Sequence, residues 1–188
     1  MIIVGMIMFK DIISPLHILY IDLVADVIPS IALAFEKDNK DSMKQKPYGL
    51  KRRVFTPFMI SSIITTALIE AGLCLGVFIF SNKFFGYDVA QTLTLLTIVL
   101  NEFVFTYNCK ELKTFSFKKG LFGNKVMNIS TLILTLVQVL VFFTPIGLLF
   151  GLVEITALQF LAVVGVNIVG FGLLEIVKPI LAKTFKDR

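Results

Sequence analysis

The sequence predicts an all-α fold, namely a polytopic transmembrane helix bundle with five full membrane helices and an N-terminal half-helix. Of the 188 residues, 56% are hydrophobic and only 16% are charged, with a mean hydropathy of +0.88. Soluble domains are about 45–50% apolar and about 25% charged. Five apolar runs are long enough to cross a bilayer as helices, and the basic residues cluster between them. We therefore expect one transmembrane domain over residues 1–188, integral to the lipid bilayer.

The first apolar run, residues 1–9, is too short to span a membrane. Nine helical residues rise about 14 Å, which is roughly half of a bilayer core of about 30 Å. The run also lacks the basic segment and the small-residue cleavage site of a signal peptide. We interpret it as the second half of a membrane helix.

Five longer runs follow, at residues 12–36, 54–82, 89–108, 126–150 and 155–177. Each is about 20 residues or more, enough to span the bilayer as a helix. Short connections between neighbouring runs, such as residues 83–88 and 151–155, predict up-and-down helical hairpins.

The basic residues predict the orientation of the bundle. Sixteen Lys and Arg residues fall in residues 37–53, residues 109–125 and the C-terminal tail, whereas the opposite side holds only Lys10 and Lys83. Cytoplasmic loops carry such an excess of basic residues. We therefore expect the loops 37–53 and 109–125 and the C-terminus to be cytoplasmic. Because topology accounts for the net charge of +5, we expect no nucleic-acid partner.

The cysteines and the single histidine suggest no further chemistry. Cys74 lies inside one apolar run and Cys109 at the end of another. At different membrane depths they cannot form a disulfide. His17 has no metal-ligand spacing around it, so we interpret it as structural.

Two aspartates interrupt the second apolar run. Asp22 and Asp26 lie four residues apart, so they share one helix face. An ionised carboxylate at the centre of a membrane helix costs about 2.5–3.5 kcal/mol, and two on adjacent turns also repel each other. No Lys or Arg lies at mid-depth in these runs. The pair therefore needs a bound cation or a proton; the structural alternative is a kinked packing helix with protonated aspartates.

Pro29 predicts a helix break beside the two aspartates. Proline has no N–H, and its ring crowds the carbonyl of Ala25. We expect helical hydrogen bonding to lapse near residues 25–26 and to free backbone oxygens there. Oxygen-rich sites suit hard cations such as calcium, and broken helices at mid-membrane recur in ion transporters.

Glu102 and Asn101 are the next candidates, near the middle of the run 89–108. A carboxylate and an amide can add two oxygens to a shared site. The alternative is a protonated Glu102 bonded to a neighbouring helix. The candidate cation ligands are therefore Asp22, Asp26 and Glu102, with Asn101 in support, and we expect no catalytic residue.

The remaining polar residues of the apolar runs are weaker candidates. Glu70 lies inside its run, and Glu175 is one turn before Lys178 and can pair with it. Gln138 and Asn167 are expected to form hydrogen bonds between helices.

Residues 15–36, "PLHILYIDLVADVIPSIALAFE", resemble the sixth membrane helix of P-type cation-transporting ATPases. "DSMKQKP" resembles the cytoplasmic loop that follows it, and "YNCKE" with "FKKGLFGNK" resembles the end of the eighth helix and the next loop. "EIVKPI" resembles the tenth helix. The resemblance implies that the chain runs from the late fifth helix to the tenth, in the plasma membrane of a prokaryote.

The resemblance also implies roles for the site residues. Asp22 and Asp26 match positions that supply side-chain ligands to the transported cation, and Glu102 matches a glutamate of reticulum-type calcium pumps. Calcium pumps usually carry Asn where this chain has Asp22. At this position the chain resembles the sodium/potassium pumps instead. Ala25 replaces the usual Thr and Val27 a frequent Gly. Calcium is the favoured ion, with sodium or potassium as alternatives.

The sequence contains no D-K-T-G-T phosphorylation loop and no T-G-E-S loop. Phosphoryl transfer needs a phosphate-accepting carboxylate and magnesium on a soluble scaffold. We therefore expect the chain to be unable to hydrolyse ATP alone, with ATP and magnesium bound by an N-terminal part of the ATPase that acts as its partner. The alternative is a free-standing small membrane protein, a proton- or cation-coupled carrier or an accessory subunit.

Overall fold

The computed structural model describes residues 12–35, 55–110, 115–119 and 123–185. Within these ranges the chain is helical and has no strand, and five helical stretches are long and apolar enough to cross a membrane. They are Pro15–Leu33, α4 (Pro57–Phe85), α5 (Tyr87–Cys109), α6 (Lys125–Phe143) and α7 (Ala157–Thr184). The predicted fold class is confirmed for the five full helices. The predicted half-helix 1–9 and the loop 37–53 lie outside the described residues.

The first of these stretches is not uniform. It consists of α2 (Pro15–Tyr20), the π-helix η1 (Ile21–Asp26) and α3 (Val27–Leu33). Two short 3₁₀ helices complete the fold, η3 (Ser116–Lys119) and η4 (Pro145–Phe150).

Local sequence fixes where the helices begin and end. Ser14, Thr56, Asn124 and Thr156 each cap a helix start with a side-chain oxygen that accepts a backbone N–H, as N-cap residues do. Gly86, with φ of +90°, turns the chain directly from α4 into α5, because glycine tolerates positive φ without steric cost.

The predicted helix 126–150 is shorter than expected, because α6 ends at Phe143. Thr144 adopts an extended backbone with φ of −129° and ψ of 163°. Pro145 then starts η4, since a proline without an N–H is tolerated at the first position of a helix but not in its interior.

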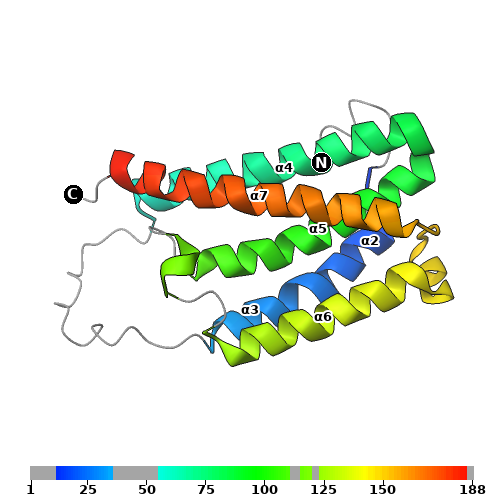
Figure 1. The fold of residues 1–188 in the computed structure, drawn as a ribbon, viewed down its shortest axis with the longest axis horizontal. Coiled ribbons are helices and arrows are strands. Elements are labelled where there is room, and N and C mark those ends of the chain that lie inside the picture. The colour runs from blue at the N-terminus through cyan, green and yellow to red at the C-terminus, as the bar shows by residue number, and fades with distance from the viewer. Residues whose placement is uncertain (1–11, 36–54, 111–114, 120–122, 186–188) are drawn as a thin grey trace.

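The α5 helix is the centre of the bundle. It packs against α4, α7, η1 and α3, while α6 packs against α3 and η4. Figure 1 shows α5 running between the α4–α7 pair and the pair formed by α6 with α2 and α3. The α5 span is 61% buried, against 17–28% for the other four spans. Leu95, Leu96 and Val99 of α5 belong to the hydrophobic core.

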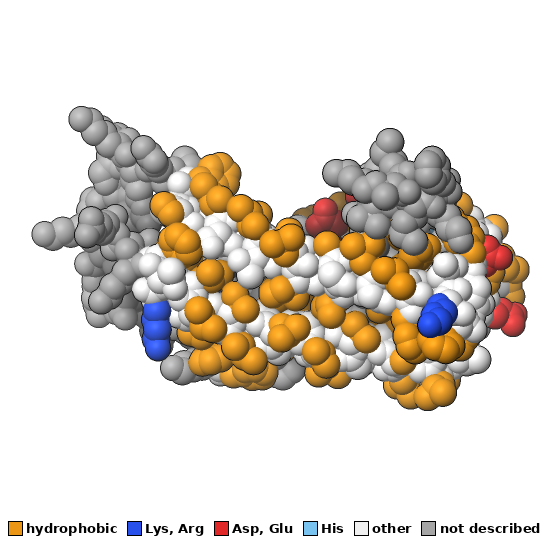
Figure 2. Space-filling view, turned by 90° about the horizontal axis from the view of Figure 1, so that it is seen from above, with side chains coloured by type: hydrophobic (Ala, Val, Ile, Leu, Met, Phe, Trp, Pro, Cys, Tyr) orange, Lys and Arg blue, Asp and Glu red, His pale blue; other side chains and the backbone are white. Residues whose placement is uncertain are grey.

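The two ends of the bundle differ in the elements they contain. At the tail end, α3, α5 and α7 finish and α4 and α6 begin; at the turn end, Gly86 joins α4 to α5 and η4 leads toward α7. Between these ends, hydrophobic side chains cover the length of the face seen in Figure 2, and the visible basic side chains lie toward its ends. This distribution matches a helix bundle surrounded by lipid.

Candidate cation site

The π-helical turn η1 carries both predicted aspartates. Asp22 lies in its first turn and Asp26 is its last residue. Both side chains are exposed, whereas Ala25 between them is fully buried against the core. π-Turns within α-helices are rare and often occur at functional sites. The two carboxylates therefore project from a helical irregularity onto a face that the described helices leave uncovered.

Pro29 does not break the helix in the way that the sequence predicts. The backbone stays helical through Pro29, which is buried inside α3. The irregularity occurs one turn earlier, as the wider turn from Ile21 to Asp26. A wider turn relieves the crowding that a proline ring imposes on the preceding turn, so the helix changes its winding without unwinding. Ser30 then donates from Oγ to Asp26 Oδ1 over 3.3 Å.

Glu102 of α5 is half-buried and interacts electrostatically with Asp26. Because η1 and α5 pack against each other, the structure brings these two predicted residues together. Asp22 has no contact of this kind among the described interactions of Glu102. The arrangement thus has a near pair, Asp26 and Glu102, and a more outlying carboxylate, Asp22.

Asn101 is buried and faces α4. Its Nδ2 donates to Cys74 Sγ over 3.5 Å. Adjacent residues on an α-helix point about 100° apart, so Asn101 and Glu102 contact different side chains: Asn101 bonds to Cys74, and Glu102 interacts with Asp26. Asn101 ties α5 to α4, and its role as a cation ligand stays a prediction.

Glu70 of α4 is a third carboxylate near this site, which sequence reasoning ranked as weak. It interacts electrostatically with Glu102. Its Oε1 is buried and accepts no hydrogen bond from the described residues. A lone glutamate in an apolar run was the available signal. The sequence did not show that Glu70 faces Glu102, because that depends on how α4 and α5 are rotated against each other.

These carboxylates do not form a closed metal site by themselves. In the described part of the chain, no three His, Cys, Asp or Glu side chains gather closely enough to hold a metal ion. Hard cations such as calcium take 6–8 oxygen ligands. Asp22 and Asp26 are exposed and Glu102 is half-buried, so the described residues alone do not complete a coordination shell of this kind.

Hydrogen bonds hold the helix that carries the aspartates. Tyr20 Oη donates to Gln138 Oε1 of α6, and both residues are buried. Asn124 Nδ2 at the start of α6 donates to the carbonyl oxygen of Ala32 over 3.2 Å. The Tyr20 ring also meets Phe150 of η4 edge-on, with centroids 4.9 Å apart. The predicted interhelical role of Gln138 is confirmed, and α6 emerges as the support of the site helix.

Other polar residues have structural roles. Glu175 pairs with Lys178 as expected, and both also bind Ser116. Asn167 differs from its prediction, because its Nδ2 donates to the carbonyl oxygen of Val163, one turn back in its own helix, rather than to another helix. Cys74 and Cys109 are free thiols, as expected.

His17 is buried and part of a helix cap. Ser14 Oγ accepts from the His17 backbone N–H at 3.3 Å, and His17 Nδ1 accepts from the Ser14 N–H at 3.5 Å. This reciprocal pattern is that of a capping box. The structural interpretation of His17 is therefore confirmed.

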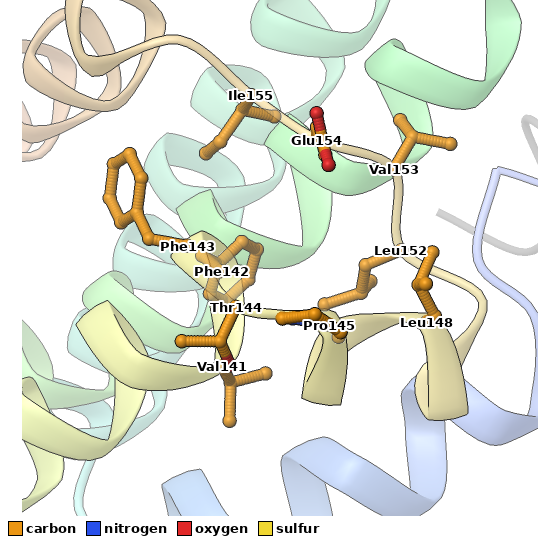
Figure 3. A pocket seen from close by; sticks show the side chains of 11 residues that line it. Val141, Phe142, Phe143, Thr144, Pro145, Leu148, Leu152, Val153, Glu154 and Ile155 are labelled. Carbon is orange, nitrogen blue, oxygen red and sulfur yellow. The ribbon is translucent and has the colours of Figure 1, made fainter.

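A pocket of about 300 Å³ lies at the turn end of the bundle, where η4 connects α6 to α7 (Figure 3). Most of the residues that line it are apolar, among them Phe142, Pro145 and Leu152, and Glu154 is its charged residue. Glu154 is exposed, and none of the candidate cation ligands lines this pocket. It is therefore separate from the carboxylate site.

The sequence matches one protein family and several known proteins. The family model described as "Cation transporting ATPase, C-terminus" matches residues 10–180. Calcium-transporting ATPase 1 of Bacillus cereus is 28% identical over 185 residues, covering 87% of this chain and 20% of that protein. The calcium-transporting ATPase of Bacillus subtilis is 26% identical over 158 residues, covering 81% of this chain and 17% of that protein.

A plasma membrane calcium-transporting ATPase of Caenorhabditis elegans is 31% identical over 111 residues, covering 54% of this chain and 9% of that protein. The chain thus spans at most about one-fifth of the length of these relatives.

Proposed function

Because the chain belongs to the family of P-type cation-transporting ATPases and matches its C-terminal membrane region, we propose that it is the C-terminal membrane part of a calcium pump and supplies ligands to the transported ion. Asp22, Asp26 and Glu102 are the proposed side-chain ligands. Asn101 supports them by fixing α5 against α4 through Cys74.

One observation carries this proposal: two exposed carboxylates lie on a π-helical turn, and a third, Glu102 of the central helix, lies near one of them, Asp26. An ionised carboxylate facing lipid costs about 2.5–3.5 kcal/mol even on the mildest scale. Asp22 and Asp26 together would cost about twice that. A bound cation and covering helices would remove most of this free-energy cost, since they replace lipid with opposite charge and polar groups.

The open face supports a proposal for the partner. Leu19, Leu23 and Ile31 are 50%, 63% and 58% exposed on the same helical stretch as the aspartates. Lipid accepts these apolar side chains but not the neighbouring carboxylates. The preceding membrane helices of the pump, supplied by its N-terminal part, are the proposed cover.

Calcium is the proposed ion for two reasons. The relatives described above are named calcium-transporting, and clustered carboxylates are the ligands that calcium prefers. Sodium and potassium bind to the same class of oxygen ligands, so they are the competing outcomes of the test below.

ATP and magnesium belong to the remainder of the pump. Phosphoryl transfer requires a nucleotide cradle and carboxylates that hold magnesium, and this chain covers only 20% of the Bacillus cereus relative. We therefore expect the purified chain to show no ATP hydrolysis. A multi-pass location in a prokaryotic plasma membrane, with a cytoplasmic C-terminus, fits the basic loops.

The test is a carboxylate-to-amide series in vesicles that contain the chain together with the N-terminal part of its pump. Asp26→Asn should nearly abolish ATP-driven calcium uptake while leaving membrane insertion intact, because an amide keeps the shape and removes the charge. Asp88→Asn is the matched control, since Asp88 is exposed in the first turn of α5.

Asp22→Asn discriminates between the ions. It should reduce uptake mildly if calcium is transported, and severely if sodium or potassium is. Full uptake in the double variant Asp22→Asn, Asp26→Asn would contradict the ligand role.

A further inference from the structure

An apolar groove lies between α4 and α7 and reaches the turn end of the bundle. These two helices run side by side (Figure 1), and the groove between them has a volume of about 500 Å³. Ligand pockets in proteins measure about 300–1,000 Å³. Gly76, Phe80 and Phe85 of α4 line it together with Leu158 and Ala162 of α7. None of the candidate cation ligands lines this α4–α7 groove, so it is separate from the carboxylate site.

Two glycines of α4 keep the groove hollow. Gly72 and Gly76 both line it and lie four residues apart, so they share one helix face. A Cβ added to either glycine would meet no atom within 4 Å. The space beside them is therefore free for a ligand, and a larger side chain at Gly76 would occupy it.

The groove ends at mid-depth, because α4 and α7 touch there. A Cβ on Gly170 of α7 would lie only 2.5 Å from Cδ1 of Leu73, which is one of the lining residues of α4. From Gln159, near the start of α7, to Gly170 the helix rises about 16 Å. One leaflet provides about half of a bilayer core of about 30 Å. The groove thus has the depth of one leaflet, which suits a lipid acyl chain, whereas a partner membrane helix would need a groove across both leaflets.

The polar groups of the groove lie at its turn end, where a lipid of this leaflet has its headgroup. Ser81 near the end of α4 and Gln159 in the first turn of α7 are its polar side chains. Lys83 is the basic residue in the last turn of α4 and is exposed. Its Nζ lies 5.8 Å from the centroid of the Phe84 ring, which packs against Phe80 of the groove with centroids 4.7 Å apart. An ammonium group at this depth can bind a lipid phosphate.

From this geometry we propose that the α4–α7 groove binds one acyl chain of an anionic phospholipid from the leaflet at the turn end, and that Lys83 binds the phosphate group of this lipid. Inside a bilayer no hydrophobic effect favours such a site. Its affinity comes from the packing of the chain between two helices and from the attraction between Lys83 and the phosphate. The proposal does not depend on the cation role of Asp26 or Glu102.

Fluorescence quenching by brominated lipid tests the site, because the chain contains no tryptophan. Phe80→Trp places one fluorophore at the groove. Ile79→Trp is the matched control, since Ile79 is 54% exposed and does not line the groove. The full chain is reconstituted in phosphatidylethanolamine bilayers that contain a small, varied fraction of phosphatidylglycerol brominated in its acyl chains.

Half-maximal quenching of Phe80→Trp should need about fivefold less brominated phosphatidylglycerol than that of Ile79→Trp, which is the preference that one Lys near the membrane surface gives to an anionic lipid. Equal midpoints would mean that ordinary surrounding lipid covers the groove, and would overturn the proposal. Absence of quenching in Phe80→Trp would also overturn it, because a protein surface, such as a second copy of the chain, would then cover the groove.

Two further changes, made in the Phe80→Trp chain, separate the acyl chain from the headgroup. Gly76→Leu should abolish the preference, because the new side chain fills the groove, whereas Gly165→Leu also adds a side chain next to open space but outside the groove. Lys83→Gln should abolish the preference for brominated phosphatidylglycerol over brominated phosphatidylethanolamine, and Lys83→Arg should keep it. A preference that survives Gly76→Leu would exclude the groove as the site. One that survives Lys83→Gln, at an exposed position where folding is not at risk, would exclude the phosphate contact.

Discussion

Glu175 should be one of the most sensitive structural positions of the chain. It is 4% exposed in α7, and its carboxylate accepts three hydrogen bonds. The donors are the Ser116 backbone N–H at 2.8 Å, Ser116 Oγ at 2.7 Å and Lys178 Nζ at 2.6 Å. Glu175→Ala removes both acceptor oxygens, which leaves the buried Ser116 N–H unpaired and leaves Lys178 Nζ with Ser116 Oγ alone. The connection between α5 and α6, where Ser116 lies, is then attached to α7 at this point only through Lys178.

The expected loss follows from these three bonds. Hydrogen bonds inside membrane proteins contribute about 0.6 kcal/mol each on average, which sets a lower bound near 2 kcal/mol. Hydrogen bonds to charged groups contribute more, about 1.5–3 kcal/mol each, so the expected loss lies above this lower bound. Lys178 is close to the end of α7, so its ammonium can reach water along its flexible stem. We therefore expect Glu175→Ala to lower the free energy of unfolding by about 2–4 kcal/mol.

Equilibrium unfolding of the chain in mixed micelles measures this loss. Glu175→Gln keeps the shape and one acceptor oxygen, so it should cost about half as much as Glu175→Ala. Ile176→Ala is the matched control, because Ile176 is the next residue and is 58% exposed. If Glu175→Ala stays within about 0.5 kcal/mol of the unaltered chain, as an ordinary surface substitution does, the cluster does not stabilise the bundle and the reasoning is refuted.

Three further predictions concern the supports and the orientation. Tyr20→Phe should lower the free energy of unfolding by about 1 kcal/mol, because buried Gln138 loses its interhelical partner; no change in micelle unfolding would contradict this. Gly147→Ala should cost about 1–3 kcal/mol, since its Cβ would lie 2.6 Å from the Val141 carbonyl oxygen, whereas Gly165→Ala meets open space and should be tolerated. Lys83→Cys should be labelled by an impermeant thiol reagent on intact cells, and Lys118→Cys only after permeabilisation; the opposite pattern would invert the topology.

The sequence was sufficient for the number and approximate positions of the membrane helices, because length and apolar composition determine which segments can span a bilayer. Boundaries followed local chemistry, so Pro145 shortened the expected helix 126–150 to Phe143. The winding of the site helix was harder to foresee. A proline signals a disturbance, but whether the backbone unwinds or forms a π-turn depends on the packing around it.

Rotation of the helices about their own axes was the main feature that the sequence left undetermined. Intramembrane carboxylates could be recognised by cost alone, so Asp26 and Glu102 were singled out as candidates. The residues that these carboxylates contact could not be predicted, because each membrane helix is apolar on several sides. Asn101 therefore turned out to face Cys74, and Glu70 to face Glu102. The pairing of Glu70 with Glu102 is a tertiary effect between two helices joined at Gly86.

The central position of α5 has a consequence for biosynthesis. The segment with Asp26 leaves the ribosome 76 residues before Glu102, as the numbering of the sequence shows. At about 5–20 residues per second of synthesis, that interval lasts on the order of ten seconds. During this time the aspartate helix is in the membrane without the helix it packs against. We therefore expect the carboxylates of this segment to stay uncovered until α5 arrives.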